Sequence, residues 1–125
     1  MTARTFRWLP RAAALLLFLP GLIELRASEV VRIHVSSNVL LERSDLVVQV
    51  LVVRDAENRA LQVTAESASF YGSSEMQIEG DTHPMVQQVR FISVPAGWYE
   101  VTGTVFDQRQ KARGTARTSV LVYPR

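Results

Sequence analysis

The chain has 125 residues, of which 47% are hydrophobic, and it contains no cysteine. That length supports one domain, and the absence of cysteine excludes disulfides and thiolate metal sites. Four of the 14 basic residues and one of the 12 acidic residues lie in the first 28 positions, so the formal charge of +2 becomes −1 (ten basic, eleven acidic) for the remainder. A domain with this charge balance carries no electrostatic signal for nucleic acid, and we expect no nucleic-acid partner.

Residues 1–28 have the pattern of an N-terminal apolar helix that acts in targeting. Basic residues precede an apolar run at residues 12–23, and Pro20-Gly21 within this run is expected to break its helix before a candidate cleavage site at Ala27. The residues assigned to this segment are Arg7, Arg11, Ala12, Leu15, Leu16, Leu17, Phe18, Leu19, Leu22 and Ile23.

Two interpretations of this segment stay open, a cleaved signal peptide and a retained membrane anchor. The uncharged run corresponds to roughly 18 Å of helix, against a hydrocarbon core of roughly 30 Å, which favours cleavage. Both interpretations place residues 29–125 outside the cytoplasm, in the periplasm, and the second anchors them to the inner membrane.

The first part of residues 29–125 predicts three strands. Residues 30–35 alternate, with Val31, Ile33 and Val35 on one face and Arg32 and His34 on the other. A short piece is expected at residues 39–41. Residues 46–53 are apolar on nearly both faces, which predicts a central strand covered on both sides. The N-terminal segment or a partner is then expected to cover its outer face.

The middle of the chain predicts a hairpin and further strands. Residues 54–59 form a polar connection suited to a hairpin, with Asn58 in a left-handed conformation. Residues 60–66 then alternate, and short strands are expected around residues 75–79 and 86–94. The inward-facing side chains in these strands are predicted to be Leu61, Val63, Ala65, Met76, Ile78, Val89 and Phe91.

Residues 95–106 combine a tight turn with an alternating strand. Tyr99, Val101 and Val105 share one face, which predicts burial, and Trp98 points the other way. A Tyr just after a turn, early in a late strand, is typical of the tyrosine corner of immunoglobulin-like sandwiches, so its hydroxyl should bond a backbone group. A closing strand is expected at residues 115–123.

The pattern as a whole predicts an all-β fold. About seven short strands follow one another at spacings of roughly ten residues, with no amphipathic helix after the leader. Tyr99 favours a single immunoglobulin-like Greek-key sandwich over an up-and-down barrel. We therefore predict two regions, a signal peptide or anchor at residues 1–28 and an immunoglobulin-like domain at residues 29–125.

Four short motifs stand out in this part of the chain: Asn-Arg-Ala-Leu at 58–61, Phe-Tyr-Gly-Ser-Ser-Glu at 70–75, Ile-Glu-Gly at 78–80 and Pro-Ala-Gly-Trp-Tyr-Glu-Val at 95–101. They resemble motifs of uncharacterised bacterial extracytoplasmic immunoglobulin-like domains. The resemblance implies a binding or spacer module. The chain departs from antibody-type domains in lacking their cysteine pair, since Val101 stands where the second would fall.

The residue types that support catalysis or metal binding do not form motifs here. His34 and His83 are expected on the surface, and no nucleophile elbow surrounds the serines at 67, 69, 73 and 74. The acids near strand ends lack a calcium-loop spacing. We therefore expect no enzyme activity, no cofactor and no metal. Five basic residues predict a solvated basic end: Arg109, Lys111, Arg113, Arg117 and Arg125.

Phe70, Tyr71 and Trp98 form the candidate interaction surface, because aromatic side chains dominate interface energetics. The function that this favours is a non-catalytic, extracytoplasmic module that binds another protein. One alternative is a small accessory subunit of an inner-membrane complex, respiratory or photosynthetic, held by an uncleaved N-terminal helix. Another is a carbohydrate-binding module that stacks sugars on Trp98 and Tyr71.

Overall fold

The computed structural model describes residues 30–125. The predicted targeting segment lies outside the described residues. Within residues 30–125, no helix is long and apolar enough to cross a membrane.

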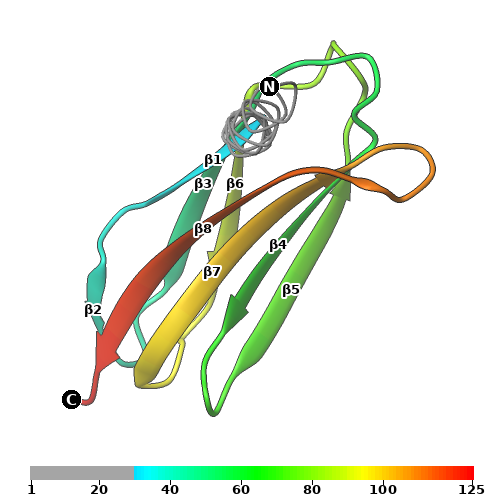
Figure 1. Ribbon diagram of the computed structural model, residues 1–125. Coiled ribbons are helices and arrows are strands. Elements are labelled where there is room, and N and C mark those ends of the chain that lie inside the picture. Colours follow the sequence, from blue (N-terminus) through cyan, green and yellow to red (C-terminus); the bar gives the residue numbers. More distant parts are fainter. Residues whose placement is uncertain (1–29) are drawn as a thin grey trace, which may run out of the picture.

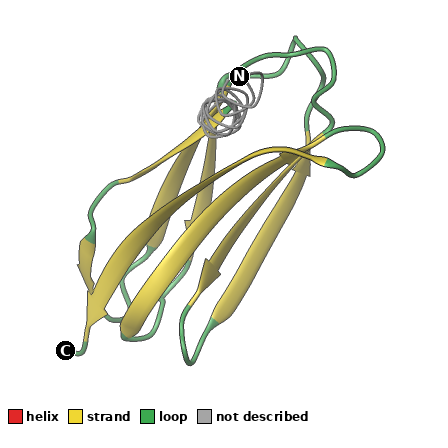
Figure 2. Ribbon diagram, viewed as in Figure 1, coloured by secondary structure: helices red, strands yellow, loops and turns green. Residues whose placement is uncertain are grey.

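Eight strands make up the described part of the chain, one more than the sequence pattern predicted, and they form two sheets (Figures 1 and 2). The all-β prediction is confirmed. The strands are β1 (Val31–Val35), β2 (Val39–Leu41), β3 (Leu46–Val52), β4 (Ala60–Glu66), β5 (Tyr71–Gln77), β6 (Val86–Phe91), β7 (Gly97–Phe106) and β8 (Ala112–Tyr123).

One sheet has three strands in the order β1-β3-β6, and the other has five in the order β2-β8-β7-β4-β5. All neighbours are antiparallel except β2, which runs parallel to β8. The β3–β4, β5–β6 and β7–β8 connections lie together at one end, called here the upper end because it is at the top of Figure 1. The C-terminus lies at the opposite, lower end.

The hairpin predicted at residues 54–59 is wrong. β3 and β4 belong to different sheets, so this connection crosses from one sheet to the other. The left-handed conformation predicted for Asn58 is also wrong, since the described non-glycine residues with positive φ are Arg43, Ser93 and Gln110. Asn58 is fully buried, and its side chain bonds neighbouring segments instead of shaping a local turn.

The core lies between the two sheets and consists of the inward-facing residues of each strand. The alternation predicted from the sequence is confirmed, because side chains successive along a strand point to opposite faces. β7 shows the pattern most clearly, with Tyr99, Val101 and Val105 buried. Fully buried core residues on the other strands include Val31, Val48, Val50, Leu61, Val63, Ala65 and Val120.

β3 is the central strand of its sheet, as its apolar sequence predicted, and it lies between β1 and β6. The predicted cover of its outer face, the N-terminal segment or a partner, lies outside the described residues. In the described part of the chain, Gln49 is exposed there, Val47 and Leu51 are half-buried, and Val53 beyond the strand end is exposed.

Three strand boundaries differ from the sequence prediction. β5 begins at Tyr71 rather than at residue 75, β8 begins at Ala112 rather than at residue 115, and β6 ends at Phe91. The Gly-Ser-Ser run in β5 has low strand propensity, but seven consecutive residues pair with β4. Tertiary pairing therefore overrides local propensity in this strand.

The turn before β7 is a tyrosine corner. The Tyr99 hydroxyl donates to the carbonyl of Pro95, four residues upstream, at 2.7 Å, which confirms the predicted backbone partner. Phe70 packs against the Tyr99 ring with 5.8 Å between centroids. Burial raises the pKa of Tyr99, and the nearby Ser67 hydroxyl opposes that rise in part. Gly97 has φ +153°, which a side chain would strain.

Candidate functional site

A buried polar network joins the connections at the upper end. Asn58, in the β3–β4 connection, is 0% exposed, and His83, in the β5–β6 connection, is 3% exposed. The Asn58 Nδ2 donates to the carbonyl of Val53 at 2.9 Å and lies 3.1 Å from His83 Nε2. Buried polar groups need hydrogen-bond partners, and Asn58 and His83 supply one to each other. Their contact joins two connections that are distant in sequence.

The burial of His83 corrects the expectation that both histidines lie on the surface, whereas His34 is exposed. The His83 Nδ1 lies 2.8 Å from the carbonyl of Pro84, so it must donate there, and Nε2 then accepts from Asn58. Both ring nitrogens are therefore used within the fold. In residues 30–125, no group of three or more His, Asp and Glu side chains is placed to hold a metal ion.

Arg113 extends this network to β8. Its Nη1 donates to Asn58 Oδ1 at 2.5 Å, and its Nη2 lies 3.4 Å from a carboxylate oxygen of Asp55. The other Asp55 oxygen accepts the Glu57 backbone N–H at 2.9 Å. The N–H of Glu57 and, to a smaller extent, Arg113 hold the pKa of Asp55 below its usual range. The charged groups of this network, Asp55 and Arg113, bond to each other and to other members of the network, which indicates a structural role.

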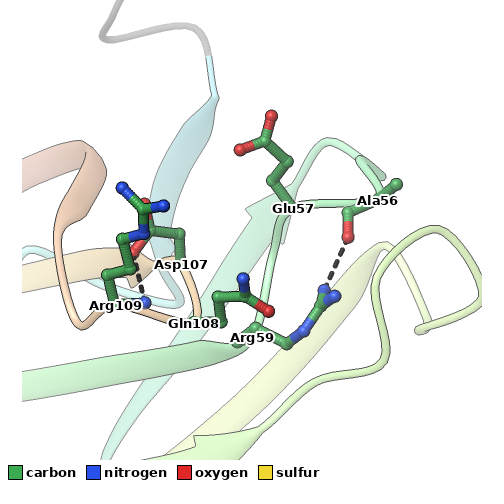
Figure 3. A pocket seen from close by; sticks show the side chains of 6 residues that line it. All are labelled: Ala56, Glu57, Arg59, Asp107, Gln108 and Arg109. Carbon is green, nitrogen blue, oxygen red and sulfur yellow. Dashed lines mark hydrogen bonds between the residues drawn. The ribbon is translucent and has the colours of Figure 1, made fainter.

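A polar hollow of about 380 Å³ opens beside this network, between the β3–β4 and β7–β8 connections (Figure 3). On one side of it, Arg59 Nη1 donates to the Ala56 carbonyl at 2.5 Å. Asp107 Oδ1 accepts the backbone N–H groups of Arg109 and Lys111 at 2.8 and 3.0 Å. The lining residues are Ala56, Glu57, Arg59, Asp107, Gln108 and Arg109. This set contains no Ser, Thr, Cys or Lys side chain that a neighbouring general base could activate as a nucleophile.

Three aspartates bond backbone N–H groups at the sandwich ends, and acid is expected to weaken the fold through them. Ser93 N–H and the Arg90 guanidinium lower the pKa of Asp45, and similar bonds lower those of Asp55 and Asp107. A carboxyl pKa that is lower in the folded than in the unfolded chain contributes stability above the ordinary value near 3.9. That contribution is lost as pH falls through the folded value.

Urea unfolding of the wild type between pH 5 and 2 should therefore show falling stability below about pH 4. Asp45→Asn should be less stable at pH 5 and lose less on acidification. The control is Asp81→Asn, at an exposed carboxylate, which should keep the wild-type pH dependence. Parallel pH profiles for the wild type and Asp45→Asn would contradict the assignment.

The three aromatic residues singled out in the sequence occupy different environments. Phe70 is half-buried and packs against the core. Tyr71 and Trp98 are 62% and 70% exposed, and both lie on the outer face of the five-stranded sheet. They do not share a strand pair, because β4 lies between β5 and β7.

Trp98 instead lies in a row with aliphatic residues of β8 and β2. Trp98 is opposite Leu121, and Leu121 is opposite Val39 on its other side. Leu41 and Tyr123 form the next pair along the same face. Val39, Leu41 and Tyr123 are each about half exposed. We call these five residues, Val39, Leu41, Trp98, Leu121 and Tyr123, the Trp98 face; it lies at the lower end.

Sequence reasoning missed four of the five residues of this face. Alternation places Leu121 and Tyr123 on one face of the closing strand, but nothing local predicted that β2 joins β8 in parallel. The visible signal was a pair of apolar residues, Val39 and Leu41, at alternate positions in a very short strand. Parallel pairing of this kind depends on the whole fold and leaves no short-range pattern.

Two acids lie in the row next to Trp98. Glu66 and Glu100 are directly opposite each other on β4 and β7, and both are exposed. Like charges in opposite positions destabilise a sheet, so this pair costs stability in the isolated molecule. Tyr71 faces Glu66 on the other side. The outer face is therefore apolar at the lower end and acidic beside it.

The basic end predicted from the sequence is not a single patch. β8 is 12 residues long, about 40 Å, and it separates Arg109 and Lys111 at the upper end from Arg125 at the lower end. Arg113 is half-buried in the network, and the Arg125 backbone N–H donates to Glu42 Oε1. Because β8 is extended along β7, the basic side chains are distributed along the sheet and do not gather at one end.

No protein-family model and no curated protein sequence matches the chain. Among solved structures, the superoxide reductase (neelaredoxin) from Ignicoccus hospitalis is similar at 11% identity, with a TM-score of 0.59, over 74% of this chain and 80% of that chain. A CARDB domain from Pyrococcus furiosus, solved with di-metal ions, is similar at 15% identity and a TM-score of 0.54, over 77% and 93%.

The reeler domain of human F-spondin is similar at 9% identity and a TM-score of 0.51, over 74% of this chain and 89% of that chain. These likenesses agree on a β-sandwich-like fold. One of the three similar proteins is a superoxide reductase, and the other two are a CARDB domain and a reeler domain. At identities of 9–15% the likeness concerns the fold alone.

Proposed function

We propose that this chain is a non-catalytic, extracytoplasmic module that binds another protein through the Trp98 face, and that its sandwich is an immunoglobulin-like Greek key. The topology is supported by the tyrosine corner at the start of β7 and by the likeness to a CARDB domain. The extracytoplasmic location is supported by the basic and apolar pattern of residues 1–28.

The observation that carries the binding proposal is the row Val39, Leu121 and Trp98 across three strands. Single exposed apolar residues are ordinary, but a contiguous exposed group marks an interaction site. Trp98 is 70% exposed, so burying its ring would contribute about 3–4 kcal/mol before the costs of association. Trp98 is the anchor residue of the proposed interface.

The surroundings of Trp98 favour a protein over a sugar as the ligand. Its cross-strand neighbour Leu121 is aliphatic, as is Val39 beyond it, so the apolar surface beside the ring spans three strands and suits the apolar centre of a protein interface. The Glu66–Glu100 pair favours a basic side chain on the partner, because that charge would relieve the like-charge repulsion. The partner surface we expect is apolar with a basic margin.

Native co-purification in mild detergent tests this proposal. Full-length tagged wild type should retain a partner protein, and Trp98→Ala should lower its recovery at least tenfold. Ile92→Ala is the matched control, because Ile92 is 73% exposed but follows β6 in the other sheet. Both substitutions are at exposed sites, so unfolding should change by less than about 0.5 kcal/mol.

Three outcomes would contradict the proposal: no partner protein, equal recovery with Trp98→Ala, or glycan binding that Trp98→Ala abolishes. Intact mass of the chain purified from its host decides a separate question. Retention of residues 1–28 in a membrane-embedded complex would identify the module as an anchored accessory subunit, whereas a mature start at Ser28 would exclude that form.

A further inference from the structure

The sandwich has four edge strands among residues 30–125, and three of them are protected against further pairing. β1 carries Arg32 and His34 on its outer face, β2 has only three residues, and β6 follows Pro84 and carries Arg90. Natural sheets use such charges, short lengths and prolines to prevent edge-to-edge association.

β5 has fewer of these protections, since Glu75 is its one charged side chain. It is seven residues long, contains no proline and no basic residue, and pairs with β4 without a bulge. Its outward residues Tyr71, Ser73, Glu75 and Gln77 are all exposed. Within the described residues, no strand pairs with its other edge. β5 is thus a long, regular and open edge (Figure 1).

The hydrogen bonds at the two ends of the β4–β5 ladder show which peptide groups face outward. Ser67 N–H donates to the Phe70 carbonyl at 2.9 Å, and Ile78 N–H donates to the Arg59 carbonyl at 3.0 Å. Bonded pairs recur at every second residue of an antiparallel ladder, so Gly72, Ser74 and Met76 bond to β4. The N–H and C=O groups of Tyr71, Ser73, Glu75 and Gln77 therefore point to the open edge.

We propose that β5 pairs antiparallel with β5 of a second copy of this chain, which joins the two five-stranded sheets into one. The two-fold axis passes through Ser74. Tyr71 is then opposite Gln77 of the second copy, and Ser73 is opposite its Glu75. This register pairs all four outward peptide groups of each copy and forms about eight hydrogen bonds.

The pairing of all four outward peptide groups supports a second copy as the occupant, and charge selects this register. Glu75 is the one charged side chain of β5. In the proposed register each Glu75 faces a Ser hydroxyl, which can donate to it. A shift of the register by one bonded pair, in either direction, leaves three of the four bonded pairs. In one of the two directions it also places Glu75 opposite Glu75 of the second copy. The edge is thus self-complementary in a single best alignment.

The edge is separate from the Trp98 face. β5 and β2 lie at opposite edges of the five-stranded sheet, so a dimer through β5 leaves the Trp98 face open on both copies. The proposed pairing therefore stands apart from the proposed partner binding, and each can fail without the other.

Sedimentation of the full chain over a range of concentrations, in mild detergent, tests the pairing. The wild type should show a monomer–dimer equilibrium, which Glu75→Pro should shift to monomer at least tenfold in Kd. A proline there removes an N–H that points to the open edge and no bond to β4. Glu75→Gln is the matched control and should still dimerise. Trp98→Ala should behave as wild type.

Ser73→Lys tests the register, because the new ammonium would face Glu75 of the second copy twice in each dimer. The dimer should tighten by about two- to tenfold. Amide exchange gives an independent measure. On dilution, exchange should accelerate at residues 71, 73, 75 and 77, and the amides of 72, 74 and 76 should stay protected.

The proposal is overturned by a wild type that remains monomeric with freely exchanging amides at 71, 73, 75 and 77. It is also overturned by dimers that Glu75→Pro leaves intact, or by protection of those amides that appears only with a different protein. Weaker dimerisation of Ser73→Lys would reject the register.

Discussion

Replacing Asn58 with alanine is expected to lower the free energy of unfolding by about 2–4 kcal/mol, since a buried polar group left without its partner costs about 1–3 kcal/mol. The substitution removes a side chain that donates to Val53 and His83 and accepts from Arg113. The His83 Nε2 then remains buried without a donor. Urea unfolding followed by tryptophan fluorescence measures the change.

Asn38→Ala is the matched control for this substitution. Asn38 makes one side-chain bond, from Nδ2 to the Ser119 carbonyl at 3.0 Å, and it is solvent-accessible. Its loss should cost less than about 1 kcal/mol. Equal losses for Asn58→Ala and Asn38→Ala would show that the buried network does not stabilise the upper end.

The second large effect is expected at Tyr99, where two substitutions separate the ring from the hydroxyl. Tyr99→Ala should lower the free energy of unfolding by about 3–5 kcal/mol, because it leaves a cavity in the core beneath Phe70. Tyr99→Phe keeps the ring and removes the bond to Pro95, so it should cost about 1 kcal/mol.

Tyr71→Ala supplies the comparison for the ring, since Tyr71 is 62% exposed and should change stability by less than about 0.5 kcal/mol. Chemical denaturation of all three variants gives the values. If Tyr99→Phe were as damaging as Tyr99→Ala, the hydroxyl would dominate this site and the packing account would be wrong. If Tyr99→Phe had no effect, the corner bond would be dispensable.

Features that depend on neighbouring residues were predictable. The strands at residues 46–52 and 60–66 follow from apolar alternation, because the two-residue repeat of a strand and the burial of apolar side chains act locally. The tyrosine corner joins two residues that are four positions apart, and it was recognised for the same reason. The opposite orientations of Trp98 and Tyr99 follow from the same alternation.

The features that were mispredicted or missed depend on contacts between distant segments. Residues 54–59 are polar whether they close a hairpin or cross between sheets, so their sequence did not distinguish the two. The burial of His83 depends on its contact with Asn58, which comes from another connection. The outward orientation of His34, by contrast, follows from its own strand.

The amino-acid sequence by itself determined most of the strands, with β5 as the main exception, the buried face of the alternating ones, and that Trp98 points away from the core. Only the tertiary structure decided that β2 runs parallel to β8 and brings Val39 and Leu121 beside Trp98, and that β5 ends the sheet with an open edge. The physical reason is that side-chain direction follows from local backbone geometry, whereas the choice of a neighbouring strand depends on how the whole core packs.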